Sequence, residues 1–93
     1  MSANFRIAET EPALAALGEP RYRKLKSKLE SYVYPQLRSN PFYGPNIKKL
    51  KGDFEDLWRY RVGKLRIFYS VEEKEKLVII HEIEDRKGAY KRR

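Results

Sequence analysis

The sequence contains no cysteine, only one histidine and no long apolar run. Without cysteine, neither disulfide bonds nor a thiolate-bound metal can hold the fold together. No apolar run reaches the roughly 18 residues that a membrane-spanning helix needs. The N-terminal residues lack a basic stretch followed by an apolar one, so no signal peptide is expected. The sequence therefore predicts a cytoplasmic protein, and it indicates no cofactor.

Acidic residues are too few to balance the basic ones. The 93 residues include 21 Lys and Arg against 13 Asp and Glu, a net charge of +8. A field of this sign attracts polyanions and raises their rates of association. Nucleic acid is the leading class of partner, an acidic protein or an anionic lipid surface comes next, and a basic surface without a role is the remaining interpretation. The length fits a single domain, 1–93, with one small core.

The first half of the chain predicts one strand and two helices. Residues 4–9 form a short β-prone segment. Residues 10–18 indicate a short helix, with a capping threonine at its start and a glycine at its end. In residues 19–37 apolar side chains recur at spacings of three and four. That pattern is typical of an amphipathic helix, here with a basic outer face, and Pro35 is expected near its end.

The second half predicts a loop followed by three strands. Residues 38–56 are punctuated by proline and glycine and are expected to form the loop. Residues 57–62 and 65–71 flank a Gly-Lys pair, and glycine in first place suits a two-residue type II′ hairpin turn. Residues 77–84 are the third strand, after a polar turn. The order β-α-α-β-β-β predicts an α+β fold, with two helices packed on one face of a small, mostly antiparallel sheet.

The predicted hairpin separates its side chains into two sets. With Gly63 and Lys64 as the turn, Val62 pairs with Leu65 and the other pairs follow in step, while successive side chains alternate between the faces. One face is apolar and is expected to meet the helices; it consists of Trp58, Tyr60, Val62, Leu65, Ile67 and Tyr69. The other, which we call the arginine face, consists of Arg59, Arg61, Arg66 and Phe68.

The arginine face has two interpretations. Arg61 lies opposite Arg66 in this register, and directly opposed like charges destabilise a sheet. The arginines could pair with Glu82 and Glu84 of the third strand, although surface ion pairs contribute little. Alternatively the face is an anion site, because the planar guanidinium group binds phosphate through two bonds and Phe68 can stack on a base.

Other basic residues flank this face and are candidate nucleic-acid contacts. They are Lys49, Lys51, Lys64 and Lys87. The segment after the third strand adds Arg86 and Tyr90, which would lie beside the hairpin if the strand order is sequential. Together with the arginine face they form a predicted cluster of cations and one phenol.

His81 is the only histidine and lies in an apolar run. It shares the face of Leu77, Ile79 and Ile83 if these three point inward. A packed or edge histidine is the favoured interpretation over an acid–base catalyst. No metal site is predicted, because no second histidine or cysteine could complete one.

These motifs resemble the RelE/ParE toxin superfamily of bacterial toxin–antitoxin modules. The resemblance is carried by NPFYGPNIKKLKGDFEDLWRYRVGKLRIFY and IIHEIEDRKGAY, and it extends from about Phe5 to Tyr90. It implies a cognate antitoxin as partner. RelE-type members are ribosome-dependent endoribonucleases that cut mRNA in the decoding site, whereas ParE-type members share the fold, poison DNA gyrase and lack that catalytic set. A basic RNA-binding module without activity is a third possibility.

The resemblance also implies a catalytic set. Its matched positions are Arg59, Arg61, Arg66, Arg86 and Tyr90. Arg59 and Arg61 stand where the best-known members have lysines, and the spacing from Arg86 to Tyr90 is shorter than in some members. The implied reaction is attack by the ribose 2′-OH on its own phosphate without a metal, with Tyr90 as base and Arg86 beside the leaving group.

Overall fold

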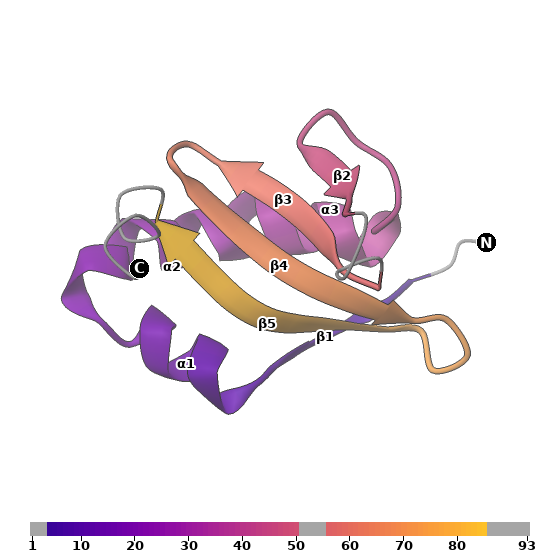
Figure 1. Ribbon diagram of the computed structural model, residues 1–93, viewed down its shortest axis with the longest axis horizontal. Coiled ribbons are helices and arrows are strands. Elements are labelled where there is room, and N and C mark those ends of the chain that lie inside the picture. The colour runs from indigo at the N-terminus through magenta and orange to yellow at the C-terminus, as the bar shows by residue number, and fades with distance from the viewer. Residues whose placement is uncertain (1–3, 51–55, 86–93) are drawn as a thin grey trace.

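The computed structural model describes residues 4–50 and 56–85. A five-stranded sheet has the strand order β1-β5-β4-β3-β2, and the helices α2 (Arg23–Lys28) and α3 (Tyr34–Ser39) lie behind it (Figure 1). The strands are β1 (Arg6–Glu9), β2 (Ile47–Lys49), β3 (Trp58–Val62), β4 (Leu65–Glu72) and β5 (Leu77–Asp85). Only β1 and β5 run parallel; the other neighbours are antiparallel. The predicted fold class is confirmed.

The helical part contains a short helix and one long composite run. The short helix is α1 (Glu11–Leu17), and the Thr10 side chain accepts a hydrogen bond from the Ala13 amide, as expected for its cap. The composite run joins a 3₁₀ turn (Pro20–Tyr22), α2 (Arg23–Lys28), a π-helical turn (Leu29–Val33) and α3 (Tyr34–Ser39). No helix among the described residues is both long enough and apolar enough to span a membrane.

The composite run continues past Pro35 and ends at Ser39, two residues beyond the predicted range. Proline cannot donate a backbone hydrogen bond, and its ring crowds the carbonyl group four residues earlier. The π-helical turn ends at Val33, just before this proline, and a locally widened turn is one way for a helix to accommodate such a residue. The chain therefore remains helical, and its apolar stripe stays on the sheet.

The apolar face of the hairpin meets this stripe as predicted. Tyr60, Val62, Ile67 and Tyr69 are buried, and Trp58 and Leu65 are half-buried against the same core. From the helical run the core receives Leu25, Leu29, Val33 and Leu37. Each fully buried aliphatic side chain of this size contributes about 1.5–3 kcal/mol through removal from water. This core holds β3 and β4 at a fixed position beneath the helices.

Two tyrosines tie the hairpin to the segments behind it. The Tyr60 hydroxyl donates to Gln36 Oε1 at 2.6 Å, and the Tyr69 hydroxyl donates to the Pro41 carbonyl at 2.7 Å. Burial raises the pKa of Tyr69 above its usual value, because the charged phenolate would lose its hydration. Both phenols therefore act as neutral donors that anchor the sheet.

The hairpin register is confirmed pair by pair, from Val62 opposite Leu65 to Trp58 opposite Tyr69. Gly63 has a φ of +59°, and Lys64 does not share this left-handed conformation. A positive φ at only the first turn residue is the pattern of the predicted type II′ turn. The arginine face therefore exists as a set and points away from the helices.

The prediction of a loop throughout residues 38–56 was wrong at β2. Ile47–Lys49 is extended because it pairs antiparallel with Trp58–Tyr60 of β3. Three residues are too few to show alternation, and their partner is distant in sequence, so no local pattern marks this strand. As a consequence, β2 covers the outer edge of β3.

A β-bulge at His81 changes the register of β5. Phe68 lies opposite Glu82, but Tyr69 lies opposite Ile80, so His81 is the additional residue. The bulge shifts the alternation, and the buried residues of this strand are Val78, Ile80 and Ile83. Strict alternation had suggested that Leu77, Ile79 and Ile83 point inward. That prediction was wrong for Leu77 and Ile79 and right for Ile83.

His81 is half-buried and lies outside the core. Its Nε2 lies 2.7 Å from the Ser70 hydroxyl, and Ser70 is on the same face of β4 as Phe68. Its backbone carbonyl accepts a hydrogen bond from Thr10 Oγ1 at 3.1 Å. This side of the bulge is thus held by the turn into α1, and His81 belongs to the outer face of the sheet.

Candidate nucleic-acid interface

Three arginines lie together on the outer face of β3 and β4, and we call them the arginine cluster: Arg59, Arg61 and Arg66. Arg61 is directly opposite Arg66, and Arg59 is opposite Phe68. The Nε atoms of Arg59 and Arg66 are buried and have no hydrogen-bond acceptor among the described residues. Burial lowers the pKa of Arg59, and the positive charges of Arg61 and Arg66 lower it further. The cluster therefore carries charge that an anion would stabilise.

The carboxylate of Glu84 compensates the cluster in part. Arg66 Nη2 lies 3.5 Å from Glu84 Oε1, and the two side chains are 34% and 23% exposed. A single long contact of this kind contributes about 0–1 kcal/mol. The ion-pair interpretation therefore holds for Arg66 and Glu84, and this contact alone does not neutralise three arginines.

A small hollow at the tip of the hairpin brings three cations together. It has a volume of about 120 Å³ and is lined by Arg61, Gly63, Lys64, Leu65 and Arg66. We call it the tip hollow. Guanidinium and ammonium groups that converge on one hollow are suited to a phosphate, because both form charge-assisted hydrogen bonds with its oxygens. Lys64, a predicted contact, is thus placed with Arg61 and Arg66.

The structure does not bring every predicted contact to this face. Lys49 pairs with Trp58 of the apolar face, and its Nζ lies 5.7 Å from the centre of the Trp58 ring. Lys48 instead pairs with Arg59 and thereby shares the arginine face. Sequence reasoning missed Lys48 because its strand was not predicted. The remaining predicted site residues, Lys51, Arg86, Lys87 and Tyr90, lie outside the described residues.

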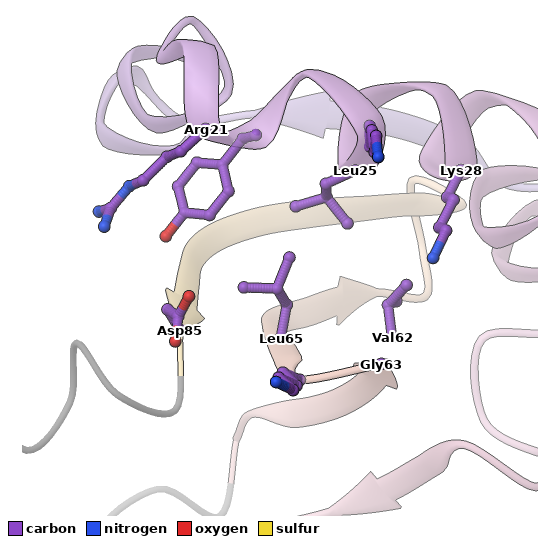
Figure 2. A pocket seen from close by; sticks show the side chains of 10 residues that line it. Arg21, Leu25, Lys28, Val62, Gly63, Leu65 and Asp85 are labelled. Atoms are coloured by element: carbon purple, nitrogen blue, oxygen red, sulfur yellow. The ribbon is translucent and has the colours of Figure 1, made fainter.

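A second concavity lies on the helix side of the hairpin tip (Figure 2). We call it the helix groove; its volume is about 270 Å³. Leu25 from the helical run faces Val62 and Leu65 from the hairpin across it. Four cations line the groove, and Asp85 stands at the end of β5; the cations are Arg21, Lys24, Lys28 and Lys64. An apolar floor with a basic rim suits an amphipathic acidic segment.

Comparison with known proteins identifies the family. Residues 7–90 match the model of the ParE toxin of type II toxin–antitoxin systems, parDE. The chain belongs to this toxin family. A protein named as the toxin RelE1 of Methanocaldococcus jannaschii is 37% identical over 71 residues, which cover 74% of this chain and 72% of that protein.

Solved structures of RelE–RelB complexes share the fold of this toxin. The RelBE2 toxin–antitoxin complex of Mycobacterium tuberculosis matches with a TM-score of 0.76 at 20% identity, over 90% of this chain and 93% of that one. The RelE–RelB complex of Pyrococcus horikoshii matches with a TM-score of 0.60 at 27% identity, over 89% and 96% of the two chains. The toxin is thus a member of the RelE/ParE superfamily.

The opposition of Arg61 and Arg66 predicts an unusual gain in stability on substitution. Arg61→Glu replaces a like-charge pair with an opposite-charge pair, so we expect the free energy of unfolding to rise by about 0.5 kcal/mol. The melting temperature should increase by a few degrees in a chain of this size. Thermal unfolding at low ionic strength is the measurement, since salt screens exposed charges.

Arg38→Glu is the matched control for this prediction. It makes the same change of charge in the last turn of α3, where a basic side chain is favourable for the helix dipole. We expect this control to lower the melting temperature slightly. An equal loss of stability in both variants would show that repulsion within the arginine cluster is negligible.

Proposed function

We propose that this toxin is a ribosome-dependent endoribonuclease of the cytoplasm, which cleaves mRNA through the ribose 2′-OH without a catalytic metal. The observation that carries the proposal is the arginine cluster, in which two buried guanidinium nitrogens have no acceptor among the described residues. A face selected for stability would not oppose Arg61 to Arg66. A polyanion that binds there gains charge-assisted hydrogen bonds and relieves the repulsion.

In the proposed reaction the protein stabilises charge and moves protons. The 2′-oxygen attacks phosphorus as its proton passes to a base, the bond from phosphorus to the 5′-oxygen breaks, and that oxygen takes a proton from solvent water. Arg61 and Arg66 of the tip hollow would hold the phosphate, with the logic of an oxyanion hole. Resemblance to RelE-type toxins assigns the base to Tyr90 and the leaving-group contact to Arg86, which stabilises charge because arginine is a poor proton donor.

A second candidate function is inhibition of a protein target without catalysis. The matching family model is that of the ParE toxin, and resemblance to ParE-type members implies DNA gyrase as the target. The arginine cluster separates the two candidates, since only the nuclease needs cations that converge on a phosphate. Cleavage of mRNA on programmed ribosomes is therefore the deciding assay.

Substitution of Arg66 tests the nuclease directly. Arg66→Ala should lower the rate of mRNA cleavage on ribosomes by about 10²–10³-fold, the usual loss when one donor to a developing negative charge is removed. The side chain lies on the outer face and is 34% exposed, so the fold should survive. Single-turnover cleavage and a thermal melt measure the two effects.

Lys74→Ala is the charge-matched control, because Lys74 is exposed in the turn between β4 and β5. It should cleave at the wild-type rate. Wild-type cleavage by Arg66→Ala, with an unchanged melting curve, would remove Arg66 from the site.

The chemical groups at the ends of the cleaved RNA should identify the attacking nucleophile. We expect a 2′,3′-cyclic phosphate or 3′-phosphate and a 5′-OH, and DNA or RNA with a 2′-O-methyl group at the cut position should resist. The chain has no cysteine and one histidine, and its described residues form no group of three or more metal-binding side chains. Cleavage should therefore persist when magnesium is lowered to what the ribosome itself needs. A 5′-phosphate product would overturn this mechanism.

The toxin's proposed partner is a cognate antitoxin, with an acidic amphipathic segment in the helix groove. Support comes from the apolar floor and basic rim of the groove, and from the structural relatives solved with RelB antitoxins. The tip hollow shares Gly63, Lys64 and Leu65 with the groove. A segment in the groove would therefore approach the proposed phosphate contacts.

Reversal of charge on the groove rim tests this partner. Lys24→Glu with Lys28→Glu should weaken the complex with the product of the adjacent gene by at least tenfold, because two attractive contacts become repulsive. Titration calorimetry at two salt concentrations measures the loss. Arg23→Glu with Arg38→Glu, whose side chains do not line the groove, is the matched control. Equal affinities for both double variants would place the antitoxin elsewhere.

A further inference from the structure

The strand β2 lies where local rules do not favour it. It has three residues and forms one edge of the sheet, so it makes few ladder hydrogen bonds. It also sets Lys48 opposite Arg59, and directly opposed like charges destabilise a sheet. Contacts on the helix side of the sheet therefore have to hold β2 in place.

Gln36 of α3 supplies one such contact through Tyr60. The Tyr60 hydroxyl donates to Gln36 Oε1 at 2.6 Å, and Tyr60 lies directly opposite Ile47 of β2. Burial raises the pKa of Tyr60, and a hydrogen bond from the Asn46 side chain partly offsets that rise. The neutral phenol thus links α3 to the residue that precedes β2.

Gly44 allows Gln36 to approach the loop closely. A Cβ atom at position 44 would overlap Gln36 Nε2 and would lie 3.3 Å from Ile47 Cδ1. The Gln36 amide could move away only by leaving the Tyr60 hydroxyl. The Gly44 carbonyl also accepts from the Ile47 amide at 3.1 Å, so this close approach lies at the turn that leads into β2. Glycine is needed here for space.

The register of β2 places Lys48 next to the arginine cluster. The Arg61 amide donates to the Asn46 carbonyl at 3.0 Å, two residues before the pair of Lys48 and Arg59. Lys48 and Arg59 therefore share the outer face. Arg61 and Arg66 form the next row on that face, about 7 Å further along the strands. Successive phosphates of an extended RNA strand have a comparable spacing.

We propose that Lys48 binds the phosphate next to the one held by Arg61 and Arg66, and that Gln36 and Gly44 are positioning residues that keep Lys48 there from the helix side. The proposal rests on the proposed nuclease function. None of these three residues belongs to the catalytic set that the family resemblance implies. A contact to a neighbouring phosphate is the same in the ground state and the transition state, so Lys48 supplies affinity and not rate.

Binding of RNA that cannot be cleaved tests Lys48 without the reaction. The probe is a fluorescent 2′-O-methyl oligouridine, titrated with the full chain at several salt concentrations. Lys48→Ala should weaken binding about threefold or more and reduce the slope of log K against log salt by about 0.7, the value for one phosphate contact to a single strand. Lys74→Ala removes the same charge from the exposed turn between β4 and β5 and should keep the wild-type slope.

Variants of the positioning residues should have the effect of removing the lysine. Gln36→Leu keeps a similar volume but cannot accept from Tyr60, so it should reduce the salt slope as much as Lys48→Ala, although glutamine carries no charge. Gln36→Glu keeps the acceptor and should retain the wild-type slope. Addition of Lys48→Ala to Gln36→Leu should have no further effect, since the lysine is already displaced. Gly44→Ala forces the Gln36 amide aside and is an independent second variant, and thermal melts establish that each variant is folded.

Cleavage kinetics on programmed ribosomes separate affinity from rate. Lys48→Ala and Gln36→Leu should raise the toxin concentration for half-maximal cleavage about threefold or more. Both should change the rate at saturation by less than about twofold, because a uniform binding contact is lost. Arg66→Ala should instead lower the rate at saturation.

The outcomes are distinguishable. A wild-type salt slope in Lys48→Ala overturns the phosphate contact. Additive losses in the double variant, or a wild-type slope in folded Gln36→Leu or Gly44→Ala, overturn the positioning role. A fall in the saturating rate of Lys48→Ala as large as that of Arg66→Ala would place Lys48 in the chemistry and contradict a binding role. If every binding result is as expected but the wild-type toxin cleaves no mRNA on ribosomes, the RNA contact stands and the nuclease function fails.

Discussion

The two-residue turn at Gly63 and Lys64 determines where every hairpin side chain points. A φ of +59° at Gly63 is accessible to glycine at little cost, whereas an L side chain there would be strained. Because strand side chains alternate with a period of two, a shift of one residue would exchange the two faces. Arginines would then enter the core, and Tyr60 and Ile67 would face solvent. The energy of the core therefore enforces the geometry of the arginine face.

Because burial of the core fixes the hairpin, its outer face can hold like charges that repel one another. Cations occupy β2 and β3, Arg66 continues them onto β4, and the carboxylates Glu82 and Glu84 follow on β5. Repulsion within the cationic half costs tenths of a kcal/mol, while each buried core residue contributes more than one. Sites at which a protein departs from local stability rules are often functional ones, because the remainder of the fold can sustain the departure.

The hairpin was predictable from sequence because its signals are local. Alternation over residues 57–71 and a glycine in the turn predict the register, the core face and the arginine face. β2 and the bulge at His81 were not predictable in this way. β2 depends on pairing with a distant strand, and the bulge depends on how β4 and β5 fit together at Tyr69. Both change the site, since they place Lys48 beside Arg59 and turn His81 toward Ser70.

The resemblance to a known family suggested roles for individual residues, which local sequence patterns could not do. It assigned roles to Arg86 and Tyr90, which lie outside the described residues, and these roles stay predictions. The described residues add two features that the resemblance did not contain, the tip hollow and the helix groove. Both come from contacts between strands, or between a strand and a helix, and sequence spacing does not show such contacts.

The positions of the tip hollow and the helix groove suggest how binding of one partner would affect binding of the other. Gly63, Lys64 and Leu65 line both the tip hollow and the helix groove, so the two sites lie on opposite sides of one turn. Carboxylates bound beside the shared Lys64 would act on the tip hollow, because exposed charges are screened only over a Debye length of about 8–10 Å. They would lower its positive potential without any movement of Arg61 or Arg66. In a protein of net charge +8, an acidic antitoxin segment could thus oppose the proposed binding of RNA through electrostatics, even where it does not cover the proposed phosphate contacts.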